Sequence, residues 1–257
     1  EKNRAPGAFL ATLLAGGLNR EIRGESRPAS PTLAERLVAG GYPEPITRAP
    51  DRTRPWHRAY LRTLVERDVQ DIARVKDATV VARLLELLAL RTAELLNTSN
   101  LSQDLGLDRQ TVENYLAILE RLFLVRRLPA WHRNEAKRLI KTPKIHLLDS
   151  GLAATLSALT AGDHIAQRTR FGHLLESFVV QQLIAQSGWT NPDLRFWHYR
   201  DKDLVEVDLV ITRGNETWGV EVKSALTATP ADGHGLRRLA EQCGSDYRGG
   251  VVLYAGS

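Results

Sequence analysis

The sequence contains no methionine and only one cysteine, Cys243. A single thiol cannot close an internal disulfide, and no cysteine–histidine cluster has the spacing of a zinc site. These absences exclude a disulfide-stapled secreted domain and a zinc finger, and they favour a reducing, cytoplasmic location. Because the chain begins at Glu1 and has no methionine, we expect it to be a piece of a longer protein.

Long apolar stretches are also missing. No run of 18 apolar residues and no signal-peptide pattern occur, so we expect no membrane partner. The composition, with 43% apolar and 25% charged residues, is ordinary for a globular protein with real cores. The length of 257 residues predicts two or three domains.

Positive charge is concentrated in the first part of the chain. Residues 1–150 carry 25 basic and 18 acidic side chains, whereas residues 151–257 carry 10 basic and 12 acidic ones. A basic half favours a polyanionic partner, and a more acidic half suits a metal site. The alternative is that an arginine-rich proteome gives basic surfaces without any such partner.

The first 78 residues predict a segment made only of helices. Apolar residues recur there at helical spacing, as in Trp56, Tyr60, Leu64 and their neighbours, and Gly40, Gly41 and Pro43 interrupt the pattern.

Residues 79–160 predict a winged-helix-like domain. Ser99 can cap a short helix that ends at Gly106, and Asp108 can cap the next helix, which runs through Leu122. A strand-like run, FLVRRLPAW, follows at 123–131. Two helices joined by a tight glycine-containing turn are the signature of the helix-turn-helix motif, and the following strand predicts a wing.

If residues 108–122 form a recognition helix, its first turns would enter the major groove of DNA. The side chains expected to contact bases and phosphates, there and in the basic stretch downstream, are Arg109, Gln110, Thr111, Asn114, Arg126, Arg127, Arg133, Lys137 and Arg138. Such a cluster would give salt-dependent binding. Winged helices also act as protein–protein adaptors, so DNA is the favoured partner and not the only one.

Residues 161–257 predict a smaller α/β domain with the element order α-β-β-β-α-β. Helices are expected at 171–186 and 236–243, and strands at 194–199, 205–211, 218–222 and 250–254. The polar segment 160–170 is the expected linker. Together with the helical first half, this predicts a mixed α+β protein.

Strand alternation places three functional groups on one face of the predicted sheet. In 205–211 the residues Val205, Val207, Leu209 and Ile211 are expected to point one way and Asp208 the other, and Glu221 and Lys223 share a face in 218–223.

Carboxylate oxygens suit Mg²⁺ or Mn²⁺, which lowers the pKa of bound water and offsets charge on a phosphate. Lys223 could orient that water or stabilise developing charge. Glu176, on the margin of the apolar stripe of its helix, could supply a further metal ligand, because a carboxylate there is costly unless paired.

Asp208, followed thirteen residues later by the run Glu221-Val222-Lys223, resembles the PD-(D/E)XK nuclease motif, and the helical Glu176 upstream matches members of that superfamily. The resemblance implies a restriction-endonuclease-like fold, catalytic roles for Asp208, Glu221, Lys223 and Glu176, and metal binding by the three carboxylates. Val207 stands where the motif has proline.

A wider resemblance covers nearly the whole chain. The runs that carry it are GGYPE (40–44), ERDVQDIA (66–73), LSQDLGLDRQTVENYLAILERLFLVRRLPAW (101–131), KRLIKTPKIHLLDSGLAA (137–154), HLLESFVVQQL (173–183), EVDLVI (206–211) and VEVK (220–223). They are similar to prokaryotic proteins in which an AAA-type ATPase precedes a domain of the domain-of-unknown-function 4143 type, whose relatives are grouped with PD-(D/E)XK nucleases.

The resemblance implies an ATPase half that this chain lacks, since no G-x-x-x-x-G-K-[ST] phosphate loop occurs. ATP would therefore bind only to the full-length protein, and the ATPase domain would be a partner alongside DNA. Homo-oligomers are a further alternative. Arg67 could contact nucleotide from a neighbour, although pairing with Asp68 or Asp71 is the favoured interpretation.

Two functions remain open from the sequence. One is a metal-dependent endonuclease that a winged helix positions on DNA. The other is a non-catalytic DNA-binding or partner-docking module of antitoxin or defence type, because a fold alone does not decide activity.

Overall fold

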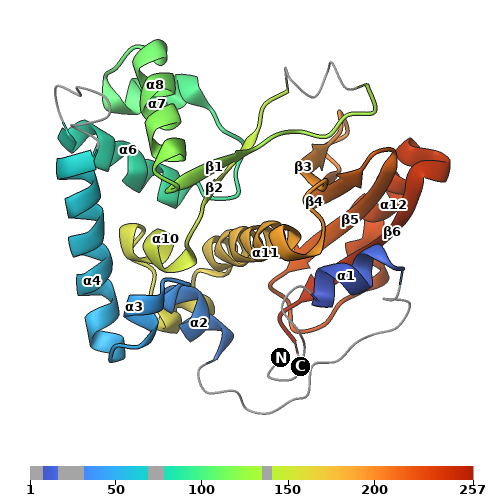
Figure 1. Ribbon diagram of the computed structural model, residues 1–257, viewed down its shortest axis with the longest axis horizontal. Coiled ribbons are helices and arrows are strands. Elements are labelled where there is room, and N and C mark those ends of the chain that lie inside the picture. Colours follow the sequence, from blue (N-terminus) through green and yellow to red (C-terminus); the bar gives the residue numbers. More distant parts are fainter. Residues whose placement is uncertain (1–7, 17–31, 69–77, 135–140, 257) are drawn as a thin grey trace. The chain divides into compact units, whose positions relative to one another are not determined.

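The computed structural model describes residues 8–16, 32–68, 78–134 and 141–256. The chain forms a mixed α+β protein with helices in its N-terminal part and a four-stranded sheet near its C-terminus (Figure 1). Packing divides it into two compact units. The first contains residues 1–30, 128–143 and 179–257, and the second contains residues 31–127 and 144–178. The three domains predicted along the sequence stay a prediction.

The second unit is mainly helical. Its helices before the turn at Gly106 are α2 (Leu33–Ala39), α3 (Pro43–Ile46), α4 (Pro50–Thr63), the π-helical η1 (Leu64–Asp68), α6 (Ala78–Leu90) and α7 (Thr98–Leu105). Thr32 precedes α2 as its N-cap and forms a capping box with Glu35. The Thr32 side chain accepts from the Glu35 amide, and the Glu35 side chain accepts from the Thr32 amide. Arg67 is exposed in η1, and its pairing with Asp68 or Asp71 stays a prediction, since Asp71 lies outside the described residues.

Helices α7 and α8 (Arg109–Arg121) are joined by a short turn, and the helix–turn–helix motif itself stays a prediction. Gly106 ends α7 in the left-handed conformation, and the Asp108 side chain accepts from the Thr111 amide at the start of α8, as expected. The predicted cap of α7 was wrong: Asn97 accepts from the Asn100 amide, so the helix begins one residue before Ser99. Strands β1 (Val125–Leu128) and β2 (Lys144–Leu147) follow as a two-stranded sheet.

Asp149 caps helix α10 (Ser150–Leu156) by accepting from the Leu152 amide, as expected. Its second oxygen accepts from the Gly41 amide at 2.6 Å. A Cβ at Gly151 would lie 2.6 Å from the backbone oxygen of Ala39, so only glycine lets α10 approach the end of α2 this closely.

The first unit contains α1 (Ala8–Leu14) and the sheet of strands β3 (Arg195–Arg200), β4 (Glu206–Arg213), β5 (Glu216–Lys223) and β6 (Tyr247–Tyr254). The strands lie in the order β3-β4-β5-β6, with β5 and β6 parallel and the other pairs antiparallel (Figure 1). With α11 (Arg168–Thr190) before β3 and α12 (His234–Cys243) before β6, the predicted order α-β-β-β-α-β is present. The 3-10 helix η2 (Ala161–His164) and the start of α11 occupy the expected linker.

Helices cover both faces of this sheet. Residues of α1 and of the second half of α11 form one buried cluster with Leu209, Ile211 and Val220. Residues of α12 form a second cluster with Val207 and Val210. No helix among the described residues is both long and apolar enough to span a membrane.

Candidate functional site

A β-bulge in β4 sets the position of Asp208. His198 of β3 alone faces both Asp208 and Leu209 of β4, and two residues opposite one is the pattern of a bulge, which bends the strand and changes where side chains point. Val207 therefore packs with α12, whereas Leu209 packs on the other face. The strict alternation predicted for β4 was wrong at this point, because one extra residue shifts its phase.

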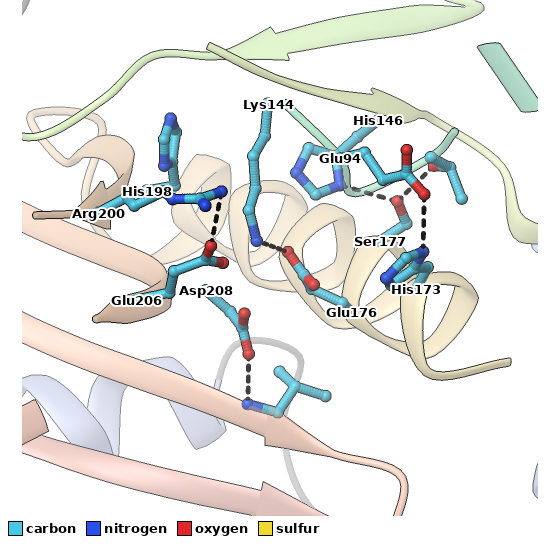
Figure 2. Close-up of polar contacts among 12 residues, drawn as sticks. Glu94, Lys144, His146, His173, Glu176, Ser177, His198, Arg200, Glu206 and Asp208 are labelled. Carbon is cyan, nitrogen blue, oxygen red and sulfur yellow. Dashed lines mark hydrogen bonds and ion pairs between the residues drawn. The ribbon is translucent and has the colours of Figure 1, made fainter. Parts of the chain in front are cut away.

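The bulge leaves Asp208 beside the Glu221-Val222-Lys223 run of β5. The Val222 amide donates to Asp208 Oδ2 at 2.8 Å (Figure 2). This bond joins a side chain of β4 to the backbone of the residue between Glu221 and Lys223. The three motif residues that the sequence predicted to lie together are therefore brought into one place within the first unit.

Glu221 is buried, with an exposed fraction of 7%. Its Oε1 accepts from Lys223 Nζ at 2.6 Å, and the backbone amide of Asp208 also acts on the carboxylate and lowers its pKa. Its Oε2 is buried and has no hydrogen-bond partner of good geometry among the residues that the structure describes. Burial, followed by the negative charge of Asp208, raises the pKa of Glu221 to about 7. A carboxylate whose pKa is raised by burial and by a neighbouring negative charge is typical of functional sites.

Lys223 is half-buried and keeps its charge. Burial alone would lower the pKa of its ammonium, but the hydrogen bond to Glu221 and the charges of Glu221, Asp208 and Asp232 outweigh burial and raise that pKa. Lys223 thus remains a cation at one side of the two carboxylates.

The donor set in the first unit fits a hard divalent cation. Asp208 and Glu221 offer oxygen ligands, and Mg²⁺ is usually bound by one or two carboxylates with several waters. A cation would supply the well-placed partner that Glu221 Oε2 lacks within the described residues and would relieve the repulsion between the carboxylates. Neither unit's described residues contain a group of three or more His, Cys, Asp or Glu that could hold an ion.

Glu176 lies in the second unit, on α11, in a buried polar cluster. Lys144 Nζ donates to Glu176 Oε1 at 2.7 Å (Figure 2). In the same cluster, Ser177 Oγ lies 2.7 Å from His146 Nδ1 and 2.7 Å from Thr92 Oγ1. The predicted cost of a carboxylate at this position is therefore met by an ion pair inside the unit.

Sequence reasoning missed Lys144 as the partner of Glu176. The signal was present, because Lys144 begins a short apolar strand whose four residues are all buried. A lysine in such a strand needs an anion, although nothing in the sequence says which one.

The predicted base-contacting residues lie at the start of α8. Arg109, Gln110 and Asn114 are exposed, and Gln110 Nε2 donates to Asn114 Oδ1 at 3.1 Å. Thr111 is half-buried, and its hydroxyl donates to Asp108 at the helix cap. Three of the four side chains are therefore available to a ligand, and the fourth holds the helix end.

Arg127 is engaged within the second unit. Its guanidinium bonds Glu120 Oε2 at 2.6 Å and Glu113 Oε2 at 2.8 Å, which ties α8 to β1. This network offers a structural role for Arg127 that the basic run in the sequence did not reveal. Of the remaining predicted cations, Arg126 is half-buried and Arg133 is exposed, while Lys137 and Arg138 lie outside the described residues.

Comparison with known families divides the chain in two. The family described as Domain of unknown function (DUF8612) matches residues 30–163, which is more than half of the chain. The chain belongs to the DUF8612 family. The family described as Domain of unknown function (DUF4143) matches residues 171–257, so the predicted type of the last third is confirmed.

The DUF8612 match contains α8 with its exposed polar face, and the DUF4143 match contains Glu176, Asp208, Glu221 and Lys223. The resemblance that we expected to be one family over nearly the whole chain is therefore divided between two families. The predicted DNA-contacting residues and the predicted catalytic residues belong to different ones.

Two bacterial relatives resemble this DUF8612 protein. The uncharacterized proteins Mb2031c of Mycobacterium bovis and Rv2008c of Mycobacterium tuberculosis are each 28% identical to it over 213 residues. The matched region covers 82% of this chain and 47% of each relative, so the chain spans about half the length of the curated relatives it matches.

Proposed function

We propose that the first unit is a metal-dependent nuclease of the PD-(D/E)XK type that cleaves phosphodiester bonds in DNA. The observation that carries this proposal is the buried Glu221 carboxylate beside Asp208, with one oxygen on Lys223 and the other without a hydrogen-bond partner of good geometry among the described residues. A structural ion pair would be expected to satisfy both oxygens.

The roles follow from this chemistry. Asp208 and Glu221 would hold Mg²⁺ or Mn²⁺, which when bound lowers the pKa of water and offsets charge on the phosphate. Asp208 is kept in position by the Val222 amide. Lys223 stays protonated and would stabilise the negative charge that develops on the phosphate.

The topology supports a restriction-endonuclease-like fold for this unit. The element order, the antiparallel β3-β4-β5 and the parallel β6 agree with what the motif resemblance implies. Active sites recur next to bulges, and the bulge at Asp208 and Leu209 agrees with that tendency.

Cleavage assays test this proposal directly. Plasmid and oligonucleotide DNA would be incubated with the chain and either Mg²⁺ or Mn²⁺, beside Asp208→Asn and Lys223→Ala. We expect metal-dependent cleavage by the parent and a loss of at least about a hundredfold in each variant. No cleavage by the parent, or equal cleavage by all three proteins, would contradict the proposal.

A non-catalytic module is the second candidate, and the closed ion pairs favour it. Lys144 already pairs with Glu176, and Lys223 already pairs with Glu221. A DNA-binding or partner-docking role would then rest on α8, whose exposed Arg109, Gln110 and Asn114 suit a major groove in a winged-helix setting. DNA binding without cleavage in the assay above would select this candidate.

The ATPase partner and any control by ATP belong to the whole protein. They stay proposals that rest on the family resemblance, as does a homo-oligomer.

A further inference from the structure

The hairpin that joins β3 to β4 presents an exposed leucine in a backbone conformation that favours glycine. Leu204 has φ +62 and is 67% exposed. The Leu204 amide donates to the Asp201 carbonyl, and the Asp201 amide donates to the Val205 carbonyl. This is a turn followed by a left-handed residue, the position where hairpins of this length usually have glycine. Strained residues of this kind cluster at ligand clamps.

The hairpin is held rigidly. Asp201 Oδ1 accepts from the amides of Asp203 and Val205 at 2.9 and 3.0 Å. Arg238 of α12 bonds Asp201 Oδ2 and Asp203 Oδ2, each at 3.0 Å. The leucine therefore projects from a turn whose backbone is fixed on both sides.

Two arginines partly offset the acidic groups in and beside the hairpin, where Arg238 also pairs with Glu241 at 3.5 Å. Arg238 pairs with Asp201 and Asp203, and Arg200 pairs with Glu206 at 2.9 Å. Lys202 is exposed and forms no ion pair with any residue in the described ranges. The exposed tip thus carries Leu204 beside Lys202, whose ammonium is a cation that a phosphate could meet.

The hairpin lies at the end of the sheet that carries the candidate site. Because β4 and β5 are antiparallel, the end of β5 at Lys223 lies at the same sheet end as the start of β4, where the hairpin joins. The segment after β5 leaves from this end too and carries Leu226, which is 75% exposed. Leu204 and Leu226 therefore belong to segments at the sheet end where Lys223 lies.

We propose that the β3–β4 hairpin inserts Leu204 between stacked bases of double-stranded DNA, with Lys202 on the adjacent phosphate. This inference rests on the proposed nuclease function and names its substrate as duplex DNA that is distorted on binding. Apolar wedges of leucine, phenylalanine or isoleucine are known to unstack base steps in this way. A partner protein would need neither the lysine nor the position beside the phosphate site.

The test measures base unstacking with duplexes that carry 2-aminopurine at successive positions, using the full chain with Ca²⁺ in place of Mg²⁺. We expect the parent to raise the fluorescence at one or two adjacent positions and Leu204→Gly to abolish this rise. The same variant should melt at a higher temperature than the parent, because glycine adopts the left-handed conformation without strain. A structural leucine would not combine a gain in stability with a loss of unstacking.

A second readout compares a fully paired duplex with one that contains a mismatch, where unstacking is already favoured. The parent should bind the mismatched duplex about tenfold more tightly, and Leu204→Gly should lose that preference. Ile165→Gly, which removes another exposed apolar side chain, is the matched control and should retain it.

The outcomes separate this inference from the nuclease proposal. Cleavage by the parent without any fluorescence rise, or a rise that survives Leu204→Gly, overturns the wedge and leaves the nuclease standing. Loss of self-association in Leu204→Gly with unchanged fluorescence would assign the hairpin to a contact between copies and also overturn it. An Asp208→Asn variant that no longer cleaves but still unstacks supports both proposals.

Discussion

At the scale of single residues, Glu221 should make stability depend on pH in an unusual direction. Its pKa is raised from 4.5 to about 7 in the folded protein. Between these values the folded state binds more protons than the unfolded state, so stability falls as pH rises through this window. Glu221→Gln removes the titration. At about pH 8 this variant should exceed the parent by up to about 3 kcal/mol, and at about pH 4 the two should be similar.

Chemical denaturation at both pH values measures this difference, and Glu216→Gln on the same strand is the control. The hydrogen bond from Arg213 is the main cause that lowers the pKa of Glu216, so the ionised carboxylate stabilises the fold at pH values above its ordinary pKa. Glu216→Gln should therefore lose stability relative to the parent as the pH rises, the opposite of the trend for Glu221→Gln. If the Glu221→Gln difference did not change with pH, burial of a charged Glu221 next to Asp208 would be disproved.

At the scale of elements, the two arginines of the α8–β1 region should have opposite roles. Arg127→Ala removes the bonds to Glu113 and Glu120 and should cost about 1 kcal/mol of stability. Arg109→Ala, at the exposed start of α8, should leave stability unchanged and lower DNA affinity, with the salt slope reduced by about 1. Melting curves and gel shifts at two salt concentrations give both numbers. Equal DNA affinity in all three proteins would remove α8 as the contact surface.

Two helical glycines offer a matched test of element packing. Gly151→Ala places a Cβ 2.6 Å from the Ala39 carbonyl and should cost about 1–3 kcal/mol, because backbone cannot move aside easily. Gly188→Ala on α11 meets no atom within 4 Å and should gain about 0.5–1 kcal/mol from the better helix propensity of alanine. Denaturation of both variants checks the signs. A gain in stability from Gly151→Ala would show that α10 and α2 are less closely packed than the structure indicates.

At the scale of the whole molecule, the local signals in the sequence predicted more than the long-range ones. The caps at Asp108 and Asp149, the turn at Gly106 and the element order of the last third depend on neighbouring residues, and all were predicted. The bulge at Asp208 could not be, because it depends on how β4 pairs with β3. Strand alternation predicted Asp208 beside Glu221, and the two lie together, although the alternation of β4 is broken at the bulge.

Pairings between distant residues were beyond the sequence for the same reason. Lys144 and Glu176 are 32 residues apart and Arg238 and Asp201 are 37 apart, so no periodicity links them. Charged residues in the basic run could equally be solvated, and only packing shows that Arg127 is tied to two glutamates.

The last prediction asks whether Glu176 stabilises the fold through Lys144 or binds the metal ion. Glu176→Gln leaves the buried Lys144 ammonium without its anion and should cost about 3–5 kcal/mol. The double variant Lys144→Gln with Glu176→Gln removes both charges, keeps hydrogen-bonding groups, and should recover most of that loss. Because the double variant should fold, metal binding can be measured in it without the confounding effect of unfolding.

Two carboxylates suffice for Mg²⁺ when water completes its shell, so we expect Mg²⁺ to stabilise the parent and the double variant alike. At a hundredfold excess over Kd this would be about 2.7 kcal/mol, measured as a melting shift. Asp208→Asn should lose the shift, and the shift in the parent should be smaller at about pH 5, where Glu221 is protonated. If the double variant lost the shift while Asp208→Asn kept it, Glu176 would be the metal ligand, and the site would have to be built around α11 instead of the bulge in β4.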